Sequence, residues 1–261
     1  MIKNVWFVLA LLIIVVWCPA AVFSETISLH ADEWCPYNCQ PGAEKPGYMV
    51  EIAQSIFRPL GHMIDYETTN WSRSIMLARA GRIHGIIGAS KSETPDLVFP
   101  DIETGYAGGA FFIRRGFGWR YAGDKSLDDF ALAVIQDYGY GRLDDYIETH
   151  RNTPRVITTA GENALELNIK MLLKGRVDVV LETEAVFRNT ASEMGVMDRL
   201  EFAGSDGETG EPNFIYIAFS PKDPDSRRYA SQLSHGIREL RASGKLREIL
   251  KKYDLEDWRS E

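Results

Sequence analysis

Residues 46–61 read PGYMVEIAQSIFRPLG, and this stretch decides the fold of the first half of the chain. Its apolar side chains recur at the i, i+3, i+4 and i+7 positions that give a helix one buried face. These apolar residues are Met49, Ile52, Ala53, Ile56, Phe57 and Leu60. Gly61 stands where a helix favours a left-handed residue at its C-terminus. The stretch therefore predicts a helix that packs with one side in the protein core.

The segments on either side of this helix alternate between strand and helix. Short apolar strands are expected at 27–30, 63–67 and 83–89, and Asn70 can cap a second helix that runs to Ala80. Strand, helix, strand, helix and strand joined by short links predict parallel strands with right-handed crossovers. The first half of the chain therefore forms an α/β unit.

A second α/β unit follows with the same pattern. Its predicted strands are 132–135, 156–158 and 177–181, and its predicted helices are 143–150, 162–174 and 184–194. Two extended stretches, 108–113 and 214–220, lie before and after this unit. Two extended crossings make a hinge, because few backbone dihedrals need to change for two lobes to close.

The C-terminal region leaves two alternatives open. Residues 229–240 and 246–253 carry two amphipathic stripes, which predict two helices. They are either the last helices of a single domain, or the chain crosses twice and they return to the first lobe. The second alternative predicts an α/β fold of two domains joined by a two-strand hinge. Its domains are lobe one, 25–112 with 216–261, and lobe two, 113–215.

The N-terminus has the order of a secretory signal peptide. Lys3 gives a positive start, and residues 5–17 form an almost unbroken apolar run that is short for a membrane span. Val22 and Ser24 fit the small-residue rule for cleavage. We therefore expect residues 1–24 to be a signal peptide.

Two alternatives to cleavage stay open. The apolar run can remain as an uncleaved anchor, or Cys18 can carry a lipid. Trp17 argues against the lipid, because a lipoprotein signal needs a small residue at that position.

Charge and cysteine content narrow the class of protein. The formal net charge is −8, and nucleic-acid binding needs a basic surface, so we expect no nucleic-acid partner. Cys35 and Cys39 are the two cysteines that follow the signal segment, and an even number in an exported chain suggests a disulfide. A C-x-x-x-C pair supplies only two metal ligands, and a catalytic redox pair usually has C-x-x-C spacing. We therefore expect a structural disulfide and no metal.

Several short motifs, in this order and spacing, are typical of one protein family. They are GYMVEIA (47–53), WSR (71–73), AGRIHG (80–85), GRVDVV (175–180) and SGKL (243–246), followed by Ile249 and Lys252-Tyr253. On these motifs the mature chain resembles bacterial extracellular solute-binding protein family 3, which includes the periplasmic polar amino-acid-binding proteins of ABC transporters. The resemblance implies the two-lobed type II periplasmic binding protein fold and a periplasmic location. It also implies a ligand held between the lobes, an ABC permease as partner, a monomer and no cofactor.

Four segments are expected at the ligand cleft, because open α/β sheets bind ligands beyond the carboxyl ends of their strands. In the loop after the first strand, Trp34 and Tyr37 offer flat apolar faces that the disulfide would hold in place. Alternatively, these two side chains pack between the loop and the domain. Trp71 and Arg73 open a helix, and the guanidinium of Arg73 suits a ligand carboxylate.

The third segment follows the strand at 83–89. Ala89, Ser90 and Thr94 offer free backbone groups and hydroxyls to a polar ligand. Amino-acid binders of the family commonly carry a threonine and then an arginine here, and the arginine clamps the ligand carboxylate. This chain has no arginine at that point, so either Arg73 or Lys91 would have to take the role.

The fourth segment belongs to the second lobe. Tyr138, Gly139 and Tyr140 lie between a strand and a helix, where backbone amides can approach a ligand closely. Amino-acid binders of the family usually place an aspartate after the strand at 177–181 for the ligand ammonium. Thr183 stands in that slot with Glu182 beside it, and Glu182 either meets a cationic group or is a solvated acid at a helix start.

These features together predict a binding protein. We expect it to capture a small polar ligand, amino-acid-like or a small organic acid, and to deliver it to a permease. Two alternatives share the same cleft: a ligand-dependent sensor partner, and a dehydratase-like periplasmic enzyme that uses Glu182 or Asp32. The sequence shows no Ser/His/Asp order, metal cluster or nucleotide-binding loop, so we predict no enzymatic activity.

Overall fold

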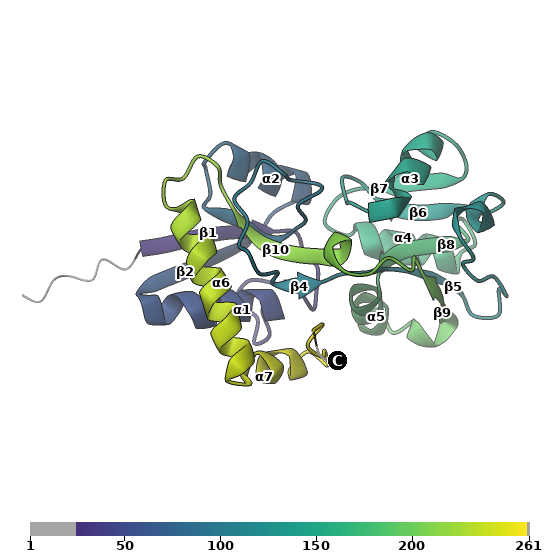
Figure 1. Ribbon diagram of the computed structural model, residues 1–261. Helices are drawn as coiled ribbons and strands as arrows, with labels where there is room; N and C mark the ends of the chain where they lie inside the picture. The colour runs from purple at the N-terminus through teal and green to yellow at the C-terminus, as the bar shows by residue number, and fades with distance from the viewer. Residues whose placement is uncertain (1–24, 260–261) are drawn as a thin grey trace, which may run out of the picture.

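The protein has two lobes, each built around a five-stranded sheet (Figure 1). The structure is a computed structural model that describes residues 25–259. The predicted signal peptide and the lipid alternative at Cys18 lie outside the described residues. Within 25–259, no helix is both long enough and apolar enough to cross a membrane.

Strands and helices alternate along most of the chain, except that three strands follow one another over residues 85–114 and two helices end the chain. The strands are β1 (Glu25–Ala31), β2 (His62–Thr68), β3 (Gly85–Ala89), β4 (Gly105–Tyr106), β5 (Gly109–Arg114), β6 (Leu132–Ile135), β7 (Val156–Thr159), β8 (Val179–Thr183), β9 (Leu200–Ser205) and β10 (Phe214–Phe219). The α-helices are α1 (Tyr48–Phe57), α2 (Trp71–Arg79), α3 (Asp144–His150), α4 (Ala164–Leu173), α5 (Glu184–Glu193), α6 (Ser226–Ala242) and α7 (Lys245–Lys251). Short 3-10 helices are η1 (Arg58–Leu60), η2 (Asp124–Leu127), η3 (Gly141–Leu143), η4 (Met197–Arg199) and η5 (Glu211–Asn213).

The first sheet has the strand order β2-β1-β3-β10-β4. β1 pairs in parallel with β2 and β3, which confirms the predicted parallel arrangement, and β10 runs antiparallel to β3 and β4. Helices α1, α6 and α7 pack over one face, where Phe57, Tyr229 and Leu246 are fully buried in one cluster. Ile86 and Ala218 pack with α2 on the other face. The C-terminal helices therefore lie on the first lobe, as the second alternative requires.

The second sheet has the strand order β7-β6-β8-β5-β9. β6 pairs in parallel with β7 and β8, whereas β5 runs antiparallel to β8 and β9. Phe112 and Phe187 stack at a centroid distance of 3.7 Å and join β5 to α5. Phe111 packs on the opposite face with Leu143 and Ile147, which belong to the α3 region. β9 was not predicted from the sequence.

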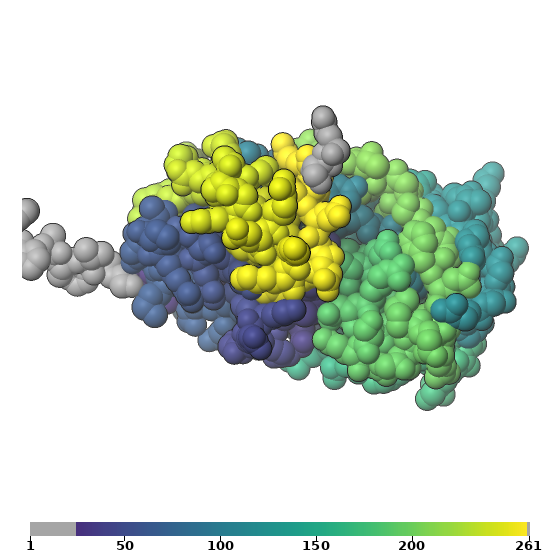
Figure 2. Space-filling view, turned by 90° about the horizontal axis from the view of Figure 1, so that it is seen from below, coloured from purple at the N-terminus to yellow at the C-terminus, as the bar shows by residue number. Residues whose placement is uncertain are grey.

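The chain crosses between the lobes twice. It leaves the first sheet at residues 107–108, between β4 and β5, and returns at 206–213, between β9 and β10. The expected domain boundaries, 112/113 and 215/216, fall inside β5 and β10, because each crossing continues directly as a strand of the sheet that it enters. The domain division itself stays a prediction. Figure 2 shows the blue and yellow surface of the first lobe against the green and teal surface of the second.

Candidate functional site

A cleft lies between the lobes, at the carboxyl ends of the parallel strands, as the sequence predicts. It consists of a large chamber of about 280 Å³ and a small chamber of about 110 Å³. We call the five residues that line both chambers the shared wall. They are Asp32, Trp34, Trp71, Tyr138 and Glu182.

A disulfide-closed loop, residues 34–39, carries Trp34 into the shared wall. Cys35 and Cys39 are bonded as predicted. Tyr37 supports Trp34 from behind, with the ring centroids 4.3 Å apart, and its hydroxyl donates to the carbonyl of Tyr106 at 2.6 Å. Tyr37 is buried and lines neither chamber. The expectation that Tyr37 faces a ligand is therefore corrected: it packs between the loop and the domain.

Trp71 stands at the first position of α2 and fixes a carboxylate in the cleft. Its indole Nε1 donates to Glu93 Oε1 at 2.5 Å. Burial raises the pKa of Glu93 to about 7, and nearby acids that include Asp32 and Asp144 add to the rise, although the bond from Trp71 opposes it. Glu93 was not singled out from the sequence, because only its position in the turn after β3 hinted at the cleft.

The turn after β3 is held by its own hydrogen bonds, and some of its residues line the small chamber. Thr94 Oγ1 donates to the carbonyl of Ser90 at 3.0 Å, and Ser90 Oγ accepts from the backbone N–H of Glu93 at 3.3 Å. Ser90 lines the small chamber. Thr94 and Ala89 are fully buried and line neither chamber, so their predicted ligand contacts are corrected to roles in shaping this turn.

Neither candidate clamp for a ligand carboxylate reaches the cleft. Arg73 is exposed on α2 and lines neither chamber. Lys91 Nζ lies 3.5 Å from Glu211 and 5.0 Å from the centroid of the Tyr216 ring, also outside both linings. Arg73 therefore lies outside the lining of both chambers, and its contact with a ligand stays a prediction.

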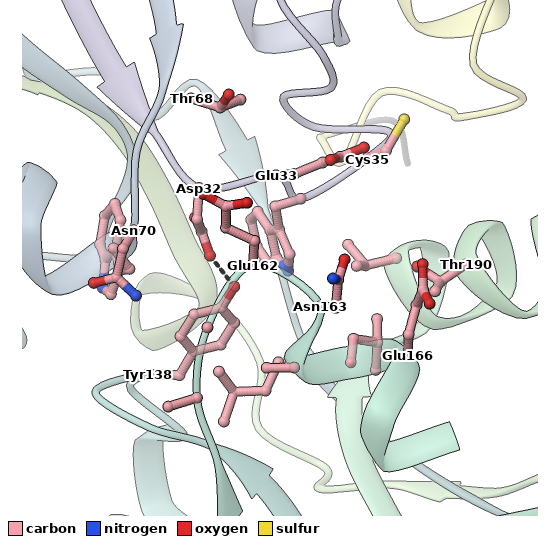
Figure 3. A pocket seen from close by; sticks show the side chains of 18 of the residues that line it. Asp32, Glu33, Cys35, Thr68, Asn70, Tyr138, Glu162, Asn163, Glu166 and Thr190 are labelled. Atoms are coloured by element: carbon pink, nitrogen blue, oxygen red, sulfur yellow. Dashed lines mark hydrogen bonds between the residues drawn. The ribbon is translucent and has the colours of Figure 1, made fainter. Parts of the chain in front are cut away.

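The second lobe supplies Tyr138 to the shared wall. The Tyr138 hydroxyl and the Asp32 carboxylate point toward one another from opposite lobes, and the hydroxyl donates to Asp32 Oδ2 (Figure 3). Burial raises the pKa of Asp32 to about 6 against the opposing effect of this bond. Gly139 and Tyr140 line the small chamber as predicted, and Tyr140 is held within its own lobe because its hydroxyl accepts from the N–H of Ile135 at 2.7 Å.

Glu182 is the penultimate residue of β8 and the most deeply buried acid of the cleft, with an exposed fraction of 3%. Its Oε1 accepts from Trp34 Nε1 at 3.1 Å and from the backbone N–H of Thr183 at 2.8 Å. Its Oε2 has no hydrogen-bond partner within the described residues. Burial raises its pKa to about 7, and the two donors on Oε1 oppose the rise. Thr183 lines the small chamber beside it.

Charge in the cleft is of one sign. In the described part of the chain, no lysine, arginine or histidine lines either chamber. No group of three His, Cys, Asp or Glu side chains in residues 25–259 is placed to hold a metal ion.

Two α/β lobes with a cleft across their strand ends have clear counterparts among solved structures. The fold is that of the two-lobed periplasmic binding proteins. A histidine kinase sensor domain with similarity to these proteins matches with a TM-score of 0.69 at 21% identity, over 88% of this chain and 96% of that chain.

Two further solved structures are of bacterial proteins described for import or for amino-acid binding. A structure described for glutathione import through a cystine ABC importer of Streptococcus mutans matches with a TM-score of 0.72 at 16% identity, over 88% of this chain and 95% of that chain. An arginine-, lysine-, histidine-binding protein of Geobacillus stearothermophilus matches with a TM-score of 0.69 at 16% identity, over 88% and 95% of the two chains.

These identities establish the fold alone. No family model matches the chain, and no curated protein matches its sequence. The predicted two-lobed α/β fold is confirmed, whereas membership of solute-binding protein family 3 stays a prediction.

Proposed function

We propose that this chain is an exported solute-binding protein that captures a small polar ligand between its lobes and delivers it to an ABC permease. The observation that carries the proposal is the shared wall, in which both lobes contribute side chains to one buried site. Asp32, Trp34 and Trp71 come from the first lobe, and Tyr138 and Glu182 come from the second. A ligand that touches both halves favours the closed arrangement through differential affinity.

The solved structures with this fold support a role in transport and also a role as a sensor partner. One of the structural matches is described for import through an ABC importer, a second is an arginine-, lysine-, histidine-binding protein, and a third is a histidine kinase sensor domain. A sensor partner would use the same cleft and the same closure. Loss of ligand uptake in cells that lack the chain supports transport, whereas unchanged uptake with a lost transcriptional response supports sensing.

A periplasmic enzyme on this fold is the remaining alternative. Asp32 and Glu182 have raised pKa values and therefore suit proton donation near neutral pH. We propose binding over catalysis, because each of these two acids accepts a hydrogen bond from a side chain of the opposite lobe, Asp32 from Tyr138 and Glu182 from Trp34. A bound compound that is recovered chemically unchanged after prolonged incubation supports binding, and its conversion supports the enzyme.

Ligand-induced closure tests the proposal. A thermal-shift screen of amino acids, amines and small organic acids should find compounds that stabilise the protein, by about 2.7 kcal/mol when the ligand stands at 100 times its Kd. Trp34 and Trp71 lie in the shared wall, so the same compounds should change the intrinsic tryptophan emission. Small-angle scattering should show a radius of gyration no larger than that of the ligand-free protein. A complete screen without stabilisation or emission change would contradict binding.

A further inference from the structure

The charged side chains that line the cleft, among residues 25–259, are all acidic. In the small chamber they are Asp32, Glu93, Glu182 and Asp206, and the large chamber adds Glu33, Asp137, Glu162, Glu166 and Glu193. A cleft lined by one sign of charge concentrates ligands of the opposite sign and repels ligands of the same sign. The lining therefore favours cations.

One of these acids, which lines both chambers, has a carboxylate oxygen without a hydrogen-bond donor among the described residues. Glu182 lines both chambers, and two N–H donors share its Oε1. Its Oε2 is buried without a partner from the described part of the protein. A buried carboxylate oxygen without a donor costs free energy. An ammonium or guanidinium group supplies both the donor and the opposite charge.

Aromatic side chains stand next to the carboxylates. Trp34, Trp71 and Tyr138 each donate a hydrogen bond to one acid of the cleft, so their rings are tied beside the acidic groups. A cation held by those acids lies close to these aromatic side chains, and their apolar surface can contact the carbon chain of an organic cation. No cluster of three potential metal ligands lies within residues 25–259.

Among the described residues, no cationic side chain lines the cleft to pair with a ligand carboxylate. Arg73 is exposed, and Lys91 is paired with Glu211 at 3.5 Å, outside both chambers. The N-terminus of α4 opens onto the large chamber, where a helix would ordinarily favour an anion. Glu162 and Glu166 line the same chamber at that helix start and counteract the effect.

From these observations we infer that the cleft binds a small organic cation without a carboxylate, an amine rather than an amino acid. The inference rests on the proposed binding function and names the ligand class of the same cleft. It replaces the expectation of an amino-acid-like ligand or an organic acid.

Matched pairs of compounds that differ by one carboxylate test the inference. The pairs are cadaverine with lysine, agmatine with arginine, and putrescine with ornithine. Calorimetry at pH 7.5 should show at least tenfold tighter binding of one or more of the amines than of the corresponding amino acid. Equal or tighter binding of the amino acids in all three pairs would overturn the inference and leave the proposed binding function intact.

Two glutamate variants test whether Glu182 is the residue that binds the cation. Glu182→Gln keeps the shape of the side chain and removes its charge, so it should weaken binding of the best amine at least tenfold while the protein remains folded. Glu248→Gln makes the same change on an exposed residue of α7 and should leave the affinity unchanged. Unchanged affinity in Glu182→Gln would overturn the assignment of Glu182 as the cation's partner. If no amine, amino acid or organic acid binds the wild-type protein, both the inference and the proposed function fail.

Discussion

Three carboxyl groups of the cleft have pKa values raised above the ordinary carboxyl range. Burial raises the pKa of Asp32 to about 6 and the pKa values of Glu93 and Glu182 to about 7. Between the ordinary carboxyl pKa and these values, the folded chain keeps protons that the unfolded chain has already released. Proton linkage therefore makes the free energy of unfolding fall as the pH rises through this window.

The variant Glu182→Gln should flatten this pH dependence. Ligand-free wild-type protein should lose stability between pH 5 and pH 7.5, and each of the three groups contributes a slope of at most about 1.4 kcal/mol per pH unit. Glutamine resembles the protonated acid at all pH values, so one contribution disappears. Denaturant unfolding at a series of pH values measures the slope, and Glu248→Gln should keep the wild-type slope. A wild-type slope in Glu182→Gln would show that Glu182 does not hold its proton in the folded state.

At the residue scale, the sequence predicts which segments reach the cleft better than it predicts which way their side chains point. Trp34 and Glu182 follow the ends of predicted strands, and parallel strands bring those ends together, so their place in the cleft could be expected. Arg73 lies outside the lining of the cleft, although it is only two positions beyond Trp71. Successive helical residues turn by about 100°, so these two side chains leave α2 on nearly opposite sides. The start of α2 was predictable to the residue, but which side of it faces the cleft was not.

The disulfide-closed loop is the element that brings Trp34 into the cleft. The double variant Cys35→Ser/Cys39→Ser should lower the free energy of unfolding by about 2 kcal/mol, because opening so short a ring restores limited entropy to the unfolded chain. Chemical denaturation measures the change. Reducing agent should reproduce it in the wild-type protein and have no effect on the variant. Equal stability of oxidised and reduced wild-type protein would contradict a stabilising role.

Amphipathic helices could be predicted at the element scale, whereas the strands β4 and β9 and one close helix contact could not. The burial pattern of β9 leaves only Leu200 and Ala203 buried, and its pairing with β5 shifts register between Ala110 and Phe112. This irregularity removes the two-residue alternation by which a strand is found. In α6, a Cβ at Gly236 would stand 2.5 Å from Ile56 Cγ2, a close helix approach that no sequence period reveals.

At the scale of the whole molecule, the acids of the cleft also hold the lobes together. Tyr138 donates to Asp32, Trp34 donates to Glu182, and Ser72 donates to Asp137. Each bond joins one lobe to the other, and each acceptor is a carboxylate that lines a chamber. A bound cation therefore contacts carboxylates that already accept hydrogen bonds from the opposite lobe. Ligand binding and the contact between the lobes depend on the same acidic groups.

Removing the hydrogen bond between Tyr138 and Asp32 should favour an open arrangement of the lobes in the ligand-free protein. A hydrogen bond to a charged group contributes about 1.5–3 kcal/mol, so Tyr138→Phe should shift the equilibrium toward open lobes by roughly 10- to 100-fold. Small-angle scattering of the ligand-free variant should show a larger radius of gyration, and saturating ligand should bring it back toward the wild-type value. Tyr146→Phe is the matched control, because it removes a hydroxyl of the second lobe that lacks a hydrogen-bond partner in the described structure. If both variants give the wild-type radius of gyration, the bond between Tyr138 and Asp32 does not control closure. The hydrogen bonds from Trp34 to Glu182 and from Ser72 to Asp137 would then have to hold the lobes together.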